Sequence, residues 1–239
     1  MISALGEESM FAGQGIMDKI VLFGGIQVVR LLSIGIGVVS TTVVHLPIMI
    51  ILHYIVFRWH NLKKSILVFI YAAYLSAVFT VVGIPTVNAL VVNPEFNWIP
   101  IIDIISSPAD YIKNTVLNII LFVPLGFLLP AIWSKYRPFK KTLFTGLGLS
   151  FNIEILQIFS YRLTDVDDLL TNTAGTIIGY YLSRTFAEKL RLKFPDSNEM
   201  HEPITLCIVV LLIMFIVQPL ISGKIWEYVL SGPLWEKIR

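Results

Sequence analysis

The chain has 239 residues, of which 56% are hydrophobic and only 14% are charged, and its mean hydropathy is +0.78. This balance excludes an ordinary soluble domain and is typical of an integral membrane protein. The formal net charge of +2 is too small to indicate a nucleic-acid partner, and the single cysteine, Cys207, excludes an intrachain disulfide. The sequence therefore predicts one domain, an all-α polytopic membrane helix bundle.

The N-terminal part consists of an end segment and a long apolar run. Residues 1–19 lack the pattern of a secretory signal peptide. We expect residues 1–30 to be an extracytoplasmic or interfacial segment, with an interfacial helix that extends through Arg30. Residues 20–57 are apolar with Arg30 as the only formal charge, about twice the length that one span needs. Either one tilted span follows the interfacial helix, or two spans meet near residues 40–45. We favour the first, because STTVVH has no Gly, Pro or Asn turn chemistry.

Five later apolar stretches each have the length of a membrane span. We expect spans at residues 65–82, 116–133, 142–159, 169–182 or a little beyond, and 204–221, which with the N-terminal span makes about six in total. The long connection at residues 83–113 contains four prolines and cannot be a continuous helix. Its apolar and aromatic residues indicate an interfacial or re-entrant loop that covers the other outer loops.

Basic residues indicate the orientation of these spans. Residues 58–64, 134–141 and 184–193 hold 11 of the 18 Lys and Arg residues, and these segments alternate with segments that carry acidic residues. The positive-inside rule then assigns one orientation without conflict, with both termini outside the cytoplasm.

Polar residues recur at helical spacing near the extracytoplasmic ends of three predicted helices. Residues three or four apart share one helix face, so the polar side chains of each helix would point the same way. An ionisable group in hydrocarbon costs several kcal/mol unless it is paired or faces a wet cavity, which makes this set a candidate ligand-binding site. Its members are Asn114, Asn118, Ser150, Glu154, Gln157, Arg162, Asp165, Asp168 and Asn172.

The carboxylates Glu154, Asp165 and Asp168 are also candidates for catalysis or for binding Mg²⁺, which prefers oxygen ligands. No cofactor is certain. The structural alternative is that Asp165 and Asp168 cap a helix start and that Arg162 neutralises a nearby carboxylate. Small residues on the same helices predict close packing faces, at Gly126, Gly146, Gly175 and Gly179.

Three blocks, NIILFVPLGFLLP, LSFNIEILQIF and YRLTDVDDLLTNTAGTIIGYYL, follow one another in the order of the VanZ-like family of bacterial membrane proteins. The chain resembles this family over residues 114–182, while residues 1–62 and the additional span at 204–221 extend beyond it. The resemblance implies a location in the bacterial cytoplasmic membrane and a role in low-level resistance to the glycopeptide teicoplanin. It also implies recurring positions at Asn118, Pro124, Gly126, Glu154, Gln157, Arg162, Asp165, Asp168, Asn172 and Gly175.

Three hypotheses for function follow. The first is a binding protein of the cell envelope, in which Arg162 contacts phosphate or carboxylate of a lipid-linked cell-wall precursor or lipoglycopeptide and the amides contact its polar groups. The second is a membrane enzyme that acts on a lipid or polyprenyl phosphate through Glu154, Asp165 and Asp168. The third is a packing scaffold that binds no ligand beyond membrane lipids. We favour the first, because no nucleophile with an adjacent base is evident.

Overall fold

The computed structural model describes residues 35–37, 39–40, 43–44, 47–48, 51, 62–92, 96–97, 104, 107–160, 164–189 and 201–231. The predicted interfacial segment at residues 1–30 and the candidate Arg162 lie outside these residues. Between residues 35 and 51 the described residues are all helical. The choice between one span and two in residues 20–57 stays a prediction.

The regular elements of the described chain are helices and one short pair of strands. The helices are α3 (Leu62–Val82), α5 (Pro108–Ile132), η2 (Ser134–Tyr136), α6 (Phe139–Gln157), α7 (Val166–Lys189), α8 (Glu202–Leu212), the π-helical η3 (Ile213–Val217) and α9 (Gln218–Ser231). Strands β1 (Phe96–Asn97) and β2 (Thr164–Asp165) pair in parallel, with Asn97 opposite Asp165. The two-residue ladder is a small departure from the all-α prediction. It joins the long loop to the α6–α7 connection, while the covering role of that loop stays a prediction.

Three helices in the described ranges are long and apolar enough to cross a membrane: Leu62–Val82, Pro108–Ile132 and the run Glu202–Ile225. They match three of the predicted spans. Helices α6 and α7 occupy two further predicted spans. They do not meet the criteria of length, hydropathy and low charge that the other three helices meet.

Two helix boundaries differ from the prediction. Helix α5 begins at Pro108, inside the predicted 83–113 loop, because proline is well suited to the first helical position and Asp110 in the first turn interacts favourably with the helix dipole. Helix α7 continues past Leu182 to Lys189, so Arg184 lies on a helix rather than in a basic loop.

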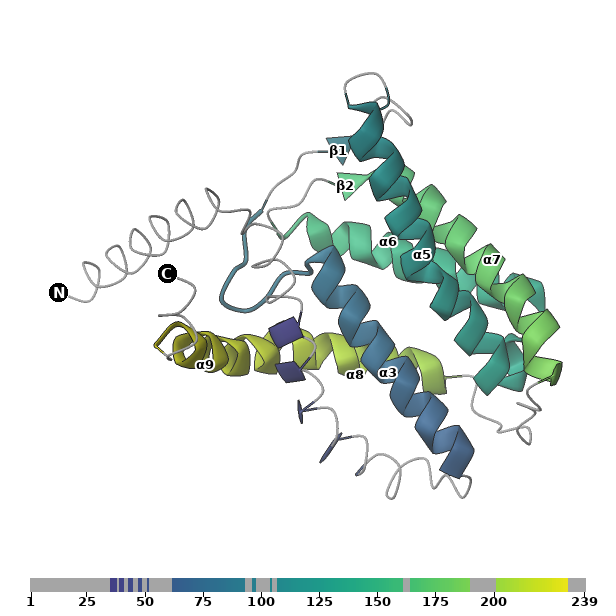
Figure 1. Cartoon of the computed structure of the whole chain (residues 1–239), viewed down its shortest axis with the longest axis horizontal. Helices are drawn as coiled ribbons and strands as arrows, with labels where there is room; N and C mark the ends of the chain where they lie inside the picture. The colour runs from purple at the N-terminus through teal and green to yellow at the C-terminus, as the bar shows by residue number, and fades with distance from the viewer. Residues whose placement is uncertain are drawn as a thin grey trace.

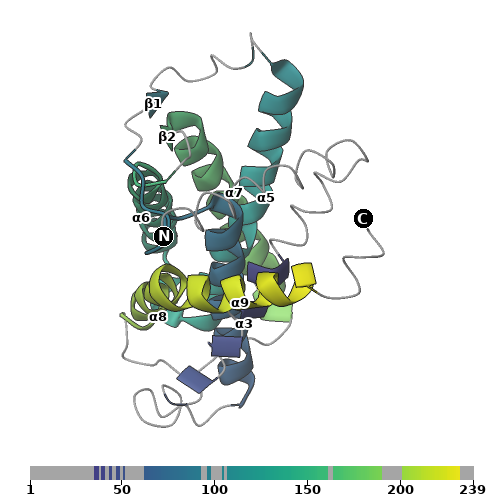
Figure 2. The same cartoon turned by 90° about the vertical axis from the view of Figure 1, so that its left-hand side faces the viewer.

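Helices α5 and α7 lie side by side, and α6 crosses them at a steep angle (Figures 1 and 2). Glycines let these helices approach closely. A Cβ atom added at Gly175 would lie 2.3 Å from the carbonyl oxygen of Ile119, and one at Gly179 would lie 2.0 Å from that of Val123. Gly126 faces the α7 backbone in the same way, and Gly146 on α6 faces the side chain of Thr176.

A hydrophobic core joins α3, α5 and the C-terminal helices. Tyr71 and Leu75 of α3, Leu125 of α5 and Leu206 and Val210 of α8 are at most 2% exposed and belong to one cluster. Helix α8 crosses α3 in Figure 1, and the two helices are in contact. Helix α8 and the adjoining η3, whose Met214 belongs to the same cluster, are therefore packed on the bundle.

The start of α3 contradicts the interpretation of Lys64 as a basic loop residue. Lys64 is buried, and its Nζ lies 3.1 Å from Oε2 of the buried Glu202 at the start of α8. A charge inside a protein costs free energy unless it is paired, so this partner accounts for the burial. The residues are 138 apart in sequence, and local sequence does not indicate such a pair.

Candidate functional site

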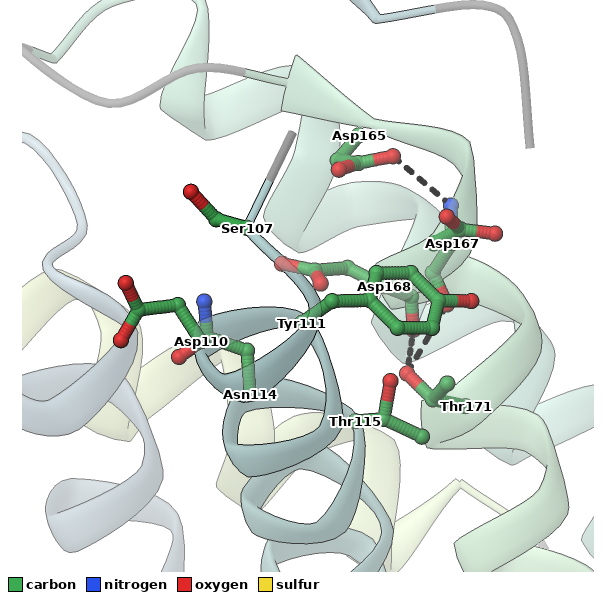
Figure 3. A pocket seen from close by; sticks show the side chains of 9 residues that line it. All are labelled: Ser107, Asp110, Tyr111, Asn114, Thr115, Asp165, Asp167, Asp168 and Thr171. Atoms are coloured by element: carbon green, nitrogen blue, oxygen red, sulfur yellow. Dashed lines mark hydrogen bonds between the residues drawn. The ribbon is translucent and has the colours of Figure 1, made fainter. Parts of the chain in front are cut away.

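A polar pocket of about 280 Å³ lies where the first turns of α5 and α7 meet β2. Side chains from the α5 end stand on one side of it and those from β2 and α7 on the other (Figure 3). The lining contains four carboxylates, three hydroxyl side chains, one amide and one phenol. These residues are Ser107, Asp110, Tyr111, Asn114, Thr115, Asp165, Asp167, Asp168 and Thr171.

Asp165 and Asp168 are held by residues from distant parts of the chain. The side-chain amide of Asn118 on α5 donates to Oδ1 of Asp168, across the α5–α7 contact. The backbone N–H of Asp167 donates to Oδ1 of Asp165 at 2.9 Å, which forms a turn before α7. The amide of Asn97 in β1 lies 3.4 Å from Oδ2 of Asp165. The long loop and α5 therefore both fix the carboxylates of the α7 start.

Glu154 contacts a residue of the pocket lining, Asp165, without lining the pocket itself. It is 6% exposed, and its Oε2 accepts a hydrogen bond of 3.0 Å from the backbone N–H of Asp165. A charge-assisted hydrogen bond of this kind is stronger than a neutral one, so Glu154 anchors β2 to the end of α6 and positions Asp165. We therefore describe Glu154 as a positioning residue.

Part of the acidity has a structural role. Asp110 lies in the first turn of α5, and Asp167 and Asp168 lie in the first turn of α7, where negative charge is favoured by the helix dipole. This effect explains why carboxylates are tolerated at both helix starts. The helix dipole does not explain why the starts of two helices lie around one pocket. It also does not explain Asp165, which lies in β2, before the start of α7.

The other predicted polar residues lie inside the bundle. The amide of Asn172 donates to Oγ of Ser150 at 3.0 Å, and both side chains are buried. The amide of Gln157 donates to the carbonyl oxygen of Val82 at 3.1 Å and fixes the end of α3 against the end of α6. These three residues connect helices and do not line the pocket.

The structure gives no geometric support for a metal ion at the predicted carboxylates. In the described ranges, which include Glu154, Asp165 and Asp168, no three His, Cys, Asp or Glu side chains are grouped so that they could hold one metal ion. The carboxylates of Asp165 and Asp168 have amide and backbone N–H partners. Binding of Mg²⁺ stays a prediction.

Of the nine predicted ligand-binding residues, Asn114, Asp165 and Asp168 line the pocket. The sequence prediction missed Ser107, Asp110, Tyr111, Thr115, Asp167 and Thr171. A usable signal was present for two of them, since Asp110 and Thr115 lie close to Asn114 on one helix. This pattern indicates a shared helix only if α5 begins at Pro108, whereas the prediction places residues 83–113 in a loop.

Comparison with known proteins gives the family. The family model described as VanZ/LLP1 matches residues 68–187, which is half of the chain. "Protein VanZ" of Enterococcus faecium is 37% identical over 71 residues, covering 29% of this chain and 44% of that protein, so the similarity spans less than half of that relative's length. No solved structure matches the chain. The three sequence blocks that resemble the VanZ-like family lie inside the matched range. The chain therefore belongs to the VanZ/LLP1 family.

Proposed function

We propose that this VanZ/LLP1-family protein lowers the susceptibility of a bacterium to glycopeptide antibiotics such as teicoplanin. It does so by binding part of the antibiotic, or of a lipid-linked cell-wall precursor, in the Asp-lined pocket. Family membership and the similarity to a protein named VanZ support the biological setting. The observation that carries the binding role is the pocket, because distant segments fix its carboxylates with Asn97, Asn118 and Glu154.

The lining favours particular chemical groups. Four carboxylates around about 280 Å³ attract cationic groups and repel anions, and the hydroxyl and amide groups suit hydroxylated ligands. The amino and hydroxyl groups of a glycopeptide, or of the peptide and sugar of a precursor, therefore fit better than its phosphate. The volume is at the lower end of the range for ligand pockets, about 300–1,000 Å³. It holds one polar group of such a ligand and not the whole molecule.

We further propose that α6 and α7 lie in the membrane with the other helices. Their polar residues Ser150, Glu154, Asn172 and Thr176 are buried in the bundle. Between Thr142 and Leu182 the exposed side chains of the two helices are apolar or aromatic except for Asn152, whose amide donates to the carbonyl oxygen of Gly148 at 2.7 Å. The exposed apolar and aromatic residues are Phe144, Leu147, Phe151, Ile155, Leu170, Ile178, Tyr181 and Leu182. A polar interior with an apolar outside suits hydrocarbon surroundings, and it explains why the mean hydropathy of these helices is low.

The distribution of charge supports an extracytoplasmic pocket. Asp168 at one end of α7 and Arg184 near the other are about 24 Å apart along the helix, close to the thickness of the hydrocarbon core. Arg184 lies at the end where the basic α6 start packs, and the positive-inside rule places that end in the cytoplasm. After replacement of Cys207, a cysteine at Asn114 should react with an impermeant reagent from outside and one at Lys140 only from inside. The opposite pattern would overturn this orientation.

The function is tested by teicoplanin susceptibility in a bacterium that lacks the protein. Wild type should raise the minimal inhibitory concentration, and Asp168→Asn should abolish most of the increase. Asparagine keeps the oxygen that accepts from Asn118 and removes only the charge, so the amount of folded protein should stay the same. Glu227→Gln, at an exposed position on α9, serves as the control. Full resistance in Asp168→Asn, or no effect of wild type, would contradict the proposal.

A further inference from the structure

A basic patch lies at the end of α7 that is remote from the pocket. We use this name for the exposed residues Arg137, Lys140 and Arg184. Arg137 follows η2, Lys140 lies in the first turn of α6, and Arg184 lies in the last part of α7. Residues 134–141 and 184–189 together contain six Lys and Arg residues and one acidic residue, Glu188, so the region has a clear excess of positive charge.

Aromatic residues hold the parts of this patch together. The ring of Phe139 packs against Tyr180 at a centroid distance of 5.2 Å and against Tyr181 at 6.0 Å. The hydroxyl of Tyr180 donates to the carbonyl oxygen of Arg137 at 2.8 Å. Arg184 follows Tyr180 by one helical turn and so lies on the same face of α7. These contacts fix the backbone positions of the three cations, which come from the end of η2, from α6 and from α7.

An apolar surface continues from the patch along both helices. Phe144 and Leu147 follow Lys140 on α6 and are 64% and 38% exposed. Tyr181 and Ile178 precede Arg184 on α7 and are 56% and 45% exposed. Tyrosine beside exposed apolar residues is typical of the boundary between lipid headgroups and hydrocarbon.

We propose that the basic patch binds the headgroup of an anionic phospholipid, whose acyl chains lie along the exposed faces of α6 and α7. The anionic phosphate complements the three cations, and the aromatic residues lie at the depth where headgroup meets chain. A soluble acidic partner would match the charge but not the apolar surface directly below it. The proposal concerns the end of the bundle opposite the pocket. It does not depend on the antibiotic role, but it rests on the proposed placement of α6 and α7 in the membrane.

The test uses the full chain purified in a neutral detergent and reconstituted into nanodiscs. Affinity for phosphatidylglycerol against phosphatidylcholine is measured by native mass spectrometry and by lipid titration of the unfolding temperature. Each cation near a membrane surface contributes enough binding free energy for about a fivefold change in affinity. The triple variant Arg137→Gln, Lys140→Gln, Arg184→Gln should therefore bind phosphatidylglycerol on the order of 100-fold more weakly.

Two controls separate a site from general charge. Lys113→Gln and Lys224→Gln each remove an exposed cation outside the patch and should leave the preference for phosphatidylglycerol unchanged. Arg137→Lys with Arg184→Lys keeps the charge and should retain most of the affinity, which also covers the case in which the triple variant folds poorly. Salt should weaken binding to wild type.

Three outcomes would overturn the proposal. The first is equal affinity of wild type for the two lipids. The second is an equal loss of affinity in the control variants, which would mean that net charge alone attracts the lipid. The third is displacement of phosphatidylglycerol by inorganic phosphate or glycerol phosphate at similar concentrations, because that result would indicate a small-anion site without any contribution from acyl chains.

Discussion

Replacing Gly179 with alanine should destabilise the bundle, because the α5–α7 contact leaves no room for a side chain. The added Cβ would lie 2.0 Å from the carbonyl oxygen of Val123 and 2.9 Å from the backbone N of Phe127. Ordinary van der Waals contact requires 3.4–4 Å, so the helices must separate by more than an ångström. The obstructing atoms belong to the backbone, and a change of rotamer cannot relieve the overlap. The same movement would lengthen the Asn118–Asp168 hydrogen bond at the pocket.

The expected loss can be bounded by two opposing effects. Overpacking of a close contact costs about 1–3 kcal/mol, and close helix packing is a main driving force for folding in a bilayer. Alanine gains about 1 kcal/mol over glycine in helix propensity. Gly148 on α6 provides a matched control, because a Cβ there meets no atom within 4 Å. Gly148→Ala should be neutral or slightly stabilising, and Gly179→Ala should be less stable than Gly148→Ala by about 1–3 kcal/mol.

The assay is reversible unfolding of both variants in a mild detergent, followed by far-ultraviolet circular dichroism. The free energy of unfolding is compared with that of wild type under identical conditions. Equal stability of Gly179→Ala and Gly148→Ala would mean that α5 and α7 do not make this contact in the folded protein. The reasoning about the packing face would then be refuted.

Two further predictions concern buried carboxylates. Glu154→Gln retains an oxygen that can accept from the Asp165 N–H, so this variant should fold. Glu154→Leu should lower both the stability and teicoplanin resistance, and equal behaviour of the two variants would exclude a positioning role. Lys64→Met leaves Glu202 buried without this cation and should lower the free energy of unfolding by about 3–5 kcal/mol. The double variant Lys64→Met with Glu202→Leu should recover most of this loss. A double variant as unstable as the single one would show that the two residues are not coupled.

Sequence patterns predicted the helices well where a segment is uniformly apolar, as in α3 and α5. They also predicted which residues of α6 and α7 share a face, because helical spacing fixes direction. They did not predict that Ser150 and Asn172 bind each other, or that Gln157 binds the end of α3. Those contacts depend on how far one helix is shifted along another, and spacing within a single helix contains no information about that shift.

The pocket was partly predicted for the same reason. Asp165 and Asp168 were recognisable as polar residues at the edge of an apolar helix. Their partners Asn97 and Asn118 lie 68 and 50 residues away, and Asn97 reaches the site only through the parallel pairing of β1 with β2. A two-residue strand inside a proline-containing loop has no periodic pattern that would indicate it.

The long loop that contains β1 also contacts the C-terminal helices, which lie beyond the residues that the family model matches. The backbone N–H of Val87 donates to the carbonyl oxygen of Phe215 at 3.0 Å, within the π-helical η3. Val91 farther along donates to the carbonyl oxygen of Phe159 at the end of α6. A π-helical segment changes the hydrogen-bonding register of a helix and often occurs at functional positions. The first contact connects the described part of the loop, residues 83–92, to the C-terminal helices, and the second connects it to the turn that follows α6.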